Sequence, residues 1–402
     1  MFADLHIHGR YSLSTSPRLH PEELARWGAV KGVGIIGTGD LTHPEWRREL
    51  ERSLEEVDGT GLYRTVAAED GVRFMVTGEV TTIWRHGGRV RRVHHLLLAP
   101  SLEEAEEVSE ALQRYGRLAG DGRPILKTSA EELVGAIVEA SPASVVVPAH
   151  VWTPHYSLFA AGTGFDSIEE CYGDESDRIF ALETGLSSDP AMNWRLSALD
   201  GVALVSNSDC HSPWPWRLGR EANILNLRRL TYDGVVEAIR SKDPERFLGT
   251  VEVYPAYGKY HWSGHRSCGV SMPPERAAAA GGLCPVCGKP MTKGVEERVE
   301  ELADRPRGFR PEGAAGFRRL MPLHEIIAKV IGVSTLDSKG VWKLYDLLVK
   351  RFGTEYAVLL DASVEELAGA VGRRLAEAII AVREGRVEVR PGYDGVYGEV
   401  SL

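Results

Sequence analysis

Short apolar runs alternate with amphipathic stretches over the first 255 residues. Runs of a length suited to buried strands occupy residues 32–40, 72–80, 93–100, 143–150, 178–186 and 201–209. Helical spacing of apolar residues fills several of the gaps, as at 21–31 and 129–140. Because strands that alternate with helices form parallel sheets, the pattern predicts an α/β fold, either an open sheet or a barrel.

The pattern changes after residue 320. Residues 323–332, 340–353 and 363–385 each carry an apolar face at helical spacing, and a short strand pattern with a turn at 390–395 follows. We therefore expect a small helical domain at the C-terminus.

Two histidines stand near the N-terminus within "ADLHIHGRYS", residues 3–12. Successive side chains of a strand alternate between its faces, so His6 and His8 point the same way. Neutral imidazole is a frequent metal ligand. This strand end is therefore either half of a metal site or a solvated end with chance histidines.

Further residues with metal-ligand chemistry recur near the ends of the later apolar runs. They are Asp40, Glu79, His94, His150, Asp209 and His211. In α/β barrels the carboxyl ends of the strands meet at one mouth, which favours a shared metal centre. Imidazoles mixed with carboxylates suit Zn, Mn or Fe, with Mg as a further choice, and Glu79 could bridge two ions.

A second cluster lies between residues 261 and 287. Cys284 and Cys287 form a C-x-x-C knuckle, and His265 with Cys268 forms a matching pair upstream. Four ligands in two pairs predict one structural Zn, with His261 as a competitor of His265. Because four protein ligands leave no open position, this site should fold the segment and not catalyse.

Charge and composition limit the setting of the protein. The chain has 402 residues, a net charge of −10 and five cysteines. It shows neither a basic-then-apolar leader nor a long apolar stretch, so we expect a cytoplasmic protein without a membrane span. Clustered cysteines fit such a reducing compartment, and Cys171 and Cys210 are expected to be buried. The acidic balance disfavours general nucleic-acid binding but leaves room for local basic patches.

One such patch follows the cysteine cluster. Residues 305–319 carry five arginines among Pro and Gly. This linker is either a solvated basic loop or a contact to phosphates, which arginine binds bidentately. Arg307 and Arg310 are the candidates, and Arg10 beside the two N-terminal histidines has the same two interpretations.

We expect a barrel at 1–255, a zinc-binding domain at 256–300 and a linker with helical domain at 301–402.

The order of the ligand motifs resembles the polymerase and histidinol phosphatase (PHP) superfamily. This resemblance covers residues 1–255 and implies a distorted (β/α)7 barrel. It implies that His6, His8, Glu79 and Asp209 hold one ion, and that His94 and His150 hold a second through Glu79. At a third site Asp40 stands where a histidine is usual, partnered by His211. The completing position falls near the weak ligands Ser14 and Thr15, with His43 as a substitute.

A longer resemblance, to the endonuclease Q family, spans nearly the whole chain. The matching stretches are 37–46, 149–174, 183–195, 206–223, 258–269, 284–290 and 391–398, with His155 where an aromatic residue is usual. This resemblance implies a DNA repair endonuclease that cuts double-stranded DNA 5′ of deaminated bases (uracil, hypoxanthine, xanthine) or of abasic sites. Repair or replication proteins are expected as further partners.

The chemistry of the residues agrees with hydrolysis by metal-activated water, which needs no Ser or Cys nucleophile. His6, His8, Glu79, Asp209 and Arg10 are the expected catalytic residues. The alternatives are a small-molecule phosphatase of the PHP type and a non-catalytic DNA-binding partner of a helicase or polymerase. An amidohydrolase also begins with H-x-H, but its bridging lysine has no evident counterpart in the apolar runs.

An enzyme that acts on a base within a duplex must first extrude it. Residues 151–178 begin at the predicted mouth and are rich in aromatic side chains. Trp152, Phe165 and Tyr172 are candidates for binding the extruded base, and the alternative is that they pack a lid.

Overall fold

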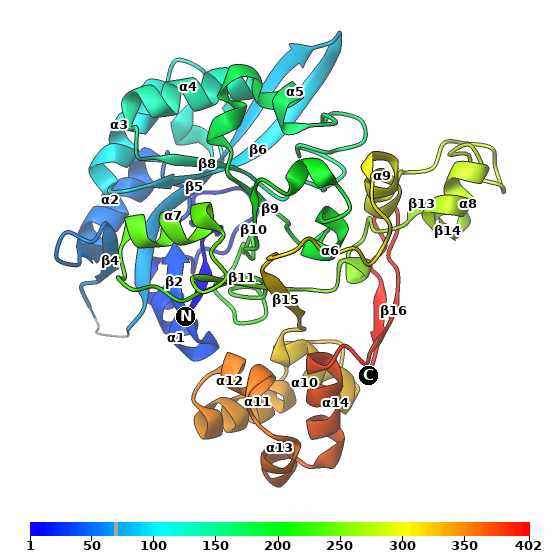
Figure 1. Cartoon of the computed structure of the whole chain (residues 1–402). Helices are drawn as coiled ribbons and strands as arrows, with labels where there is room; N and C mark the ends of the chain where they lie inside the picture. Colours follow the sequence, from blue (N-terminus) through cyan, green and yellow to red (C-terminus); the bar gives the residue numbers. More distant parts are fainter. Residues whose placement is uncertain (68–70) are drawn as a thin grey trace.

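The computed structural model describes residues 1–67 and 71–402 (Figure 1). The strands from the N-terminus to the end of the barrel are β1 (Phe2–Asp4), β2 (Val33–Gly37), β3 (Leu54–Glu56), β4 (Leu62–Thr65), β5 (Arg73–His86), β6 (Arg89–Ala99), β7 (Ile125–Leu126), β8 (Val145–Pro148), β9 (Ala181–Glu183), β10 (Ala203–Val205), β11 (Ala222–Leu225) and β12 (Phe247–Glu252). The helices among them are α1 (Pro21–Lys31), α2 (Pro44–Ser53), α3 (Leu102–Leu112), α4 (Ala130–Ala140), α5 (Ile168–Tyr172), α6 (Pro190–Asn193) and α7 (Tyr232–Ser241).

Seven of these strands form a ring. β1, β2 and β5 pair in parallel, β6 pairs with β5 and β8, and β9 pairs in parallel with β10. The amide of Val151, just after β8, donates to Glu183 O of β9 at 3.0 Å. A bridge between Ile7 and Cys210 then joins the ends of β1 and β10. The distorted seven-stranded barrel expected from the PHP resemblance is therefore confirmed.

The barrel departs from an all-parallel sheet at β6, which runs antiparallel to both β5 and β8. The reason lies in the turn, because Gly87 and Gly88 both have positive φ (58° and 76°) and join β5 to β6 directly. A two-residue turn of this kind makes a hairpin and leaves no room for a crossover helix. The hairpin continues past the barrel as a long arm (Figure 1).

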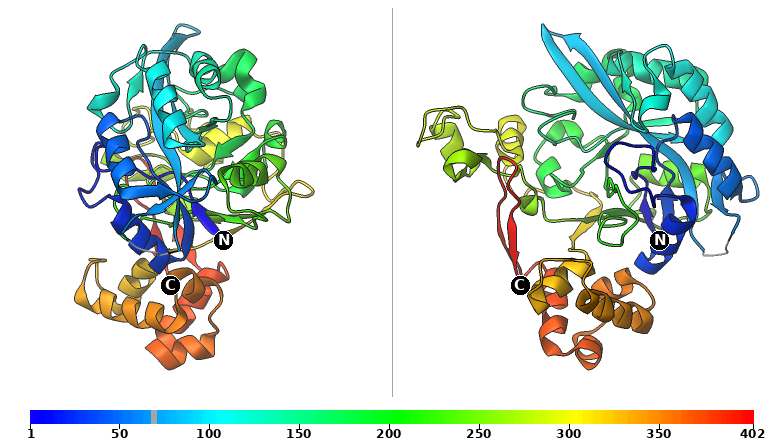
Figure 2. Two further views of the ribbon diagram at one scale, coloured as in Figure 1. Left: turned by 90° about the vertical axis from the view of Figure 1, so that its left-hand side faces the viewer. Right: turned by 180° about the vertical axis from the view of Figure 1, so that it is seen from behind.

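The chain beyond the barrel forms two further parts, seen from two sides in Figure 2. Their elements are β13 (Ser263–His265), β14 (Val270–Met272), α8 (Pro274–Ala279), α9 (Val295–Leu302), β15 (Gly316–Arg319), α10 (Leu323–Ile331), α11 (Lys339–Phe352), α12 (Glu355–Leu360), α13 (Val364–Val371), α14 (Arg373–Arg383), β16 (Glu388–Arg390) and β17 (Glu399–Ser401). The predicted helix at 363–385 is two helices, because Gly372 with φ 83° separates them. No helix of the described residues is long and apolar enough to cross a membrane.

These parts are tied back to the barrel. β15, within the expected linker, pairs in parallel with β12. The turn between β16 and β17 returns to the cysteine-rich segment, where Asp394 accepts hydrogen bonds from Arg266 N (2.6 Å) and Thr292 Oγ1 (2.6 Å). The C-terminal hairpin thus connects the helical part with the cysteine-rich segment.

A buried ion pair fastens the helical part to the barrel. Lys31 Nζ of α1 lies 2.7 Å from Glu355 Oε1 of α12 and donates to Pro215 O at 2.8 Å. Both side chains are at most 1% exposed. Tyr345 Oη donates to the other oxygen of Glu355 at 2.9 Å, so the carboxylate keeps hydrogen-bond partners on both oxygens.

Replacing Lys31 with alanine should lower the free energy of unfolding by about 3–5 kcal/mol, because it leaves the Glu355 charge buried and unpaired. Urea unfolding followed by tryptophan fluorescence measures this. Lys343→Ala, at an exposed position of α11, is the matched control and should change stability by less than about 0.5 kcal/mol. Equal stabilities of the two variants would contradict a stabilising role for the pair.

Candidate metal centre

Two overlapping groups of ligands lie at the barrel mouth. His6, His8, Glu79 and Asp209 form the first, and Glu79, His94 and His150 form the second. Within each group the ligand atoms lie within 4.8 Å of one another. The structure therefore brings together six of the eight side chains predicted as metal ligands, although they are spread over 204 residues of sequence.

The barrel explains this convergence. His6 and His8 follow β1, His150 follows β8 and Asp209 follows β10, so these four lie past strand ends, as predicted. His150 and Asp209 have positive φ (33° and 46°), a conformation that residues other than glycine adopt infrequently and that clusters at functional sites. Glu79 and His94 instead lie within β5 and β6, because the long hairpin continues beyond the mouth.

Glu79 occupies the centre of the arrangement. Its Oε1 lies 2.6 Å from His94 Nδ1 and 3.1 Å from His150 Nε2. Its Oε2 lies 3.4 Å from His8 Nε2 and 3.6 Å from His6 Nε2. Each oxygen thus faces one ligand group, which is the geometry of a carboxylate that bridges two ions.

The electrostatics of the cluster match this geometry. Burial acts to raise the pKa of Glu79, but His94 and the other surrounding imidazoles hold it well below its usual value. Burial likewise opposes the charge of His6, yet Glu183 and Glu79 raise the pKa of this imidazole. The pKa of Asp209 is lowered despite burial, chiefly through its hydrogen bond with His8. The carboxylates therefore remain anionic and favour positive charge between them.

The donor set fits divalent ions. Among the described residues, the buried Nε2 of His6 has no hydrogen-bond partner, although it faces the first ligand group. A buried imidazole nitrogen without a partner is costly unless a ligand satisfies it. Nitrogen and carboxylate donors together suit Zn, Mn or Fe.

A residue that sequence reasoning missed supports His6 from behind. Glu183, at the end of β9, is fully buried and lies 2.9 and 3.0 Å from His6 Nδ1 through its two oxygens. It also accepts from His150 N at 2.8 Å and from Asn207 Nδ2 at 2.8 Å. Such a carboxylate fixes the tautomer and the orientation of a ligand histidine. An acidic residue within the apolar run 178–186 was the available signal.

Glu183→Gln should weaken metal binding about 10- to 100-fold, because the neutral amide no longer fixes the His6 tautomer. Competition with a chelator of known affinity measures the effect. Glu169→Gln, at an exposed position of α5, is the matched control and should bind metal like the wild type. Wild-type affinity in Glu183→Gln would show that the carboxylate does not support the centre.

The remaining predicted ligands lie around His8 and do not form a third group. Asp40 Oδ1 lies 3.4 Å from His8 Nδ1 and accepts from Ser12 Oγ at 2.8 Å. The ring centroid of His211 lies 4.4 Å from that of His8. Neither belongs to a group of three or more candidate ligands among the described residues. They are placed to orient His8, and a third ion stays a prediction.

The weak ligand Thr15 and the substitute His43, both named for that third site, have other contacts. His43 caps α2, where its Nδ1 accepts from Trp46 N at 3.4 Å, and its ring stacks on Tyr11. Thr15 Oγ1 donates to Ser12 O at 2.6 Å. His43 therefore serves the helix start, and it belongs to none of the ligand groups among the described residues.

The arginine that contacts the metal-ligand groups is Arg123 and not Arg10, which the sequence suggested. Arg10 forms an ion pair with Glu49 at 2.7 Å, which favours the interpretation of a surface arginine, and its contact with a phosphate stays a prediction. Arg123 instead donates to Glu79 Oε2 at 3.3 Å and has a partly exposed guanidinium. Arg123 lies in a short loop without a recognisable motif, so the sequence offered no signal for it.

The three aromatic candidates of the segment 151–178 are core residues. Trp152, Phe165 and Tyr172 are each at most 2% exposed. Trp152 Nε1 donates to Asn193, Phe165 stacks on Trp84, and Tyr172 Oη lies 2.9 Å from His95 Nδ1. The prediction that they stack on an extruded base is wrong for this structure, because no face of these rings is free. They pack the segment into the hydrophobic core.

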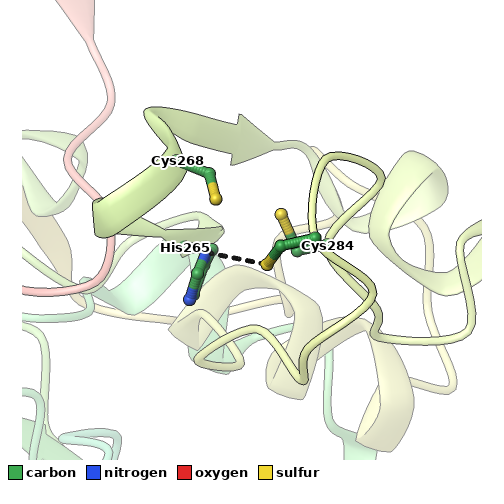
Figure 3. A group of neighbouring side chains, drawn as sticks. His265, Cys268 and Cys284 are labelled. Atoms are coloured by element: carbon green, nitrogen blue, oxygen red, sulfur yellow. Dashed lines mark hydrogen bonds between the residues drawn. The ribbon is translucent and has the colours of Figure 1, made fainter.

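The cysteine-rich cluster assembles as predicted. His265, Cys268, Cys284 and Cys287 place their ligand atoms within 4.8 Å of one another. Figure 3 shows the side chains of His265, Cys268 and Cys284 directed towards a common space. His261 Nε2 instead lies 3.3 Å from Glu296, so His265 and not His261 belongs to the cluster.

The thiols of this cluster influence one another. The hydrogen bond with Cys287 raises the pKa of Cys268 to about 11. Burial opposes ionisation of Cys284, but backbone N–H groups of the knuckle lower the pKa of this thiol. Of the other cysteines, Cys171 and Cys210 are buried and free, as expected.

The two candidate arginines of the linker contact other residues of the protein. Arg307 Nη2 lies 3.1 Å from Glu275 and 3.4 Å from both Glu296 and Glu300. Arg310 Nη2 donates to Ala314 O at 2.8 Å. These contacts favour the interpretation of a structural linker, and contact of Arg307 and Arg310 with phosphates stays a prediction.

Comparisons with known proteins place this site in a family. A family model described as the MJ0043 C-terminal domain matches residues 322–386. YqxK of Bacillus subtilis is 29% identical over 100% of this chain and 99% of its own length. MJ0043 of Methanocaldococcus jannaschii is 31% identical over 79% of this chain, which corresponds to 41% of that longer protein.

The similarity to solved structures extends over the whole chain. The lesion-specific endonuclease PfuEndoQ of Pyrococcus furiosus is 34% identical, with a TM-score of 0.89 over 100% of this chain and 95% of its own. Endonuclease Q in complex with a 27-mer duplex substrate that has an abasic lesion at the active site gives 34% identity and a TM-score of 0.88 over 100% and 96% of the two chains. This chain, with its barrel-mouth ligand groups and its cysteine-rich segment, therefore belongs to the endonuclease Q family.

Proposed function

We propose that this protein is a metal-dependent DNA repair endonuclease. It hydrolyses the phosphodiester on the 5′ side of deaminated bases, namely uracil, hypoxanthine and xanthine, and of abasic sites. The observation that carries the proposal is the six-residue centre bridged by Glu79, in a chain that matches a lesion-specific endonuclease along its full length.

Two divalent ions held by the two ligand groups would generate a hydroxide at neutral pH and neutralise charge on the phosphate. The residues around them fix the imidazoles. Glu183 accepts a hydrogen bond from Nδ1–H of His6, and Asp40 lies beside Nδ1 of His8, so each histidine turns its Nε2 towards Glu79. Ligand nitrogens held in this way lose little freedom when an ion binds.

Arg123 provides a positive charge at the edge of the centre. Its guanidinium contacts Glu79 and is partly open to solvent. Arginine pairs with phosphate through parallel hydrogen bonds. We infer that Arg123 binds the phosphate to be cleaved and holds it against the ligand groups.

The test is to map the cut on end-labelled duplexes that contain one uracil, hypoxanthine, xanthine or abasic site, with an undamaged duplex and a phosphomonoester as controls. The protein is loaded in turn with Mn, Mg and Zn. We expect cleavage of the phosphodiester on the 5′ side of the lesion and no comparable cut in undamaged DNA. Hydrolysis of the phosphomonoester alone would overturn the proposal in favour of a small-molecule phosphatase.

A further inference from the structure

The hairpin arm formed by β5 and β6 carries a concentration of positive charge that the metal centre does not use. Four arginines lie within eight residues of its tip region, namely Arg85, Arg89, Arg91 and Arg92. No acidic residue occurs from position 80 to position 102, although the whole chain has a net charge of −10. A local cationic patch on an acidic protein indicates an anionic partner.

The arm leaves the barrel on the side of the mouth. β5 runs parallel to β2 and so to β1, which leads into His6. Past Glu79, β5 therefore continues outward from the mouth, and its tip stands clear of the rest of the chain (Figures 1 and 2). The tip at His86 is seven residues from Glu79, which corresponds to about 23 Å of strand. A polymer bound at the metal centre can reach the arm, whereas a small ligand cannot.

One face of the arm is continuous with the metal centre. Glu79 and Arg85 are six residues apart on β5, and residues an even number apart share a face of a strand. His94 of β6 pairs with Thr81, so it belongs to the same face. This face therefore leads from the two ligand groups to the side chain of Arg85, about 20 Å further along the strand.

The opposite face of the arm packs against the chain itself. Phe165 stacks on Trp84 with ring centroids 5.5 Å apart, and its ring meets that of His86 edge-on at 5.4 Å. Arg91 places its guanidinium carbon 4.3 Å from the centroid of the same Phe165 ring. Arg89 pairs with His86 at the end of this face. The arm is thus held through one face, which leaves the outer part of the other face open.

Arg85 on the open face is available to a ligand. Its side chain is exposed and has no hydrogen bond or ion pair among the described residues, and its cross-strand neighbour Val90 is 37% exposed. Arg305 and Arg307 of the linker, in contrast, each pair with an acidic side chain. An exposed, unpaired guanidinium suits a phosphate, which arginine binds through two parallel hydrogen bonds.

We propose that the hairpin arm binds duplex DNA, and that Arg85 pairs with a backbone phosphate about six nucleotides from the bond that is cleaved. The inference rests on the proposed function and adds a contact distant from the cleaved bond. The spacing follows from the 20 Å of strand between Glu79 and Arg85, because a DNA strand rises about 3.4 Å per nucleotide. A two-stranded ribbon also fits the major groove, which is about 12 Å wide.

Arg85→Ala and Arg89→Ala form a matched pair of variants for the test. They remove the same charge from exposed positions on opposite faces of one tip. Single-turnover cleavage of a long abasic duplex by the full-length metal-loaded protein gives the half-saturating enzyme concentration. Arg85→Ala should raise this concentration about five-fold without slowing cleavage at saturating enzyme, and Arg89→Ala should stay within about two-fold.

Duplex length tests the spacing. A duplex that extends about four base pairs to each side of the lesion ends before Arg85, whereas one that extends about ten base pairs passes it. The difference between Arg85→Ala and the wild type should therefore appear with the long duplex and disappear with the short one. An equal difference with both duplexes would overturn the distance assigned to this contact.

Binding without cleavage separates the inference from the proposed function. Fluorescence anisotropy of a labelled, undamaged long duplex at several salt concentrations needs no cut. Arg85→Ala should reduce the slope of log affinity against log salt by about one, and Arg89→Ala should keep the wild-type slope. An unchanged slope in Arg85→Ala, or equal losses in both variants, would overturn the assigned contact. A wild type that cuts no lesion duplex would overturn the proposed function, and the slopes would still decide whether the arm binds DNA.

Discussion

Replacing Asp209 with asparagine should reduce lesion cleavage by at least about a thousand-fold. The side chain belongs to the first ligand group, and its oxygen lies 2.9 Å from His8 Nε2. Asparagine has the same size as aspartate, but it removes one negative charge and replaces an anionic metal ligand with a weaker, neutral one. Metal ions stabilise such transition states by several kcal/mol, and each 1.4 kcal/mol corresponds to about ten-fold in rate.

The fold should survive this change. Asp209 has φ +46°, which asparagine adopts with little cost, whereas alanine would be strained there. Thermal melting and circular dichroism of Asp209→Asn should therefore match the wild type. Asp233→Asn, at an exposed position of α7, is the control for loss of an acidic charge and should retain full activity. Wild-type cleavage by chelator-washed and reloaded Asp209→Asn would contradict the assignment of this ligand.

Cys284→Ser should release one zinc ion per chain and unfold the cysteine-rich segment. The segment has little else to stabilise it, because β13 and β14 have three residues each and Val286 at the knuckle is 69% exposed. Structural zinc sites contribute about 10–16 kcal/mol of apparent binding energy, which is folding energy for the segment. Loss of one of the four ligands removes a large part of this folding free energy.

Metal analysis, thermal melting and limited proteolysis measure this prediction. We expect one zinc fewer, a lower first melting transition and new cleavage sites within 266–292. Ser267→Ala changes an exposed hydroxyl next to Cys268 and should leave all three readouts unchanged. An unaltered zinc content and melting curve in Cys284→Ser would show that the four side chains hold no ion.

Several features of the centre follow from local spacing. His6 and His8 share one strand face because side chains alternate along a strand, and the structure places both in one ligand group. The C-x-x-C knuckle likewise brings Cys284 and Cys287 together through a tight turn. Strand and helix periodicity located the barrel helices at 21–31 and 130–140 closely, because burial of one face imposes the period on the residues.

Other features depend on contacts between distant segments. The sequence suggested Arg10 beside the ligands, yet Glu49 is near enough to pair with it, and Arg123 occupies the place next to Glu79. The antiparallel direction of β6 sets the register that aligns His94 with Thr81, two residues from Glu79. A residue's type reveals what it can bind, but not which of several equivalent residues the fold will bring to the site.

The sequence by itself determined the ligand types, the strand and helix periods and the zinc knuckle, since these are encoded within a few neighbouring residues. Only the tertiary structure decided that Glu183 supports His6 from another strand and that Tyr172 is sealed in the core while Tyr156 stays half-exposed. The physical reason is that burial and pairing depend on packing between segments far apart in the chain. Aromatic residues of one segment therefore have similar sequence signals and different surroundings.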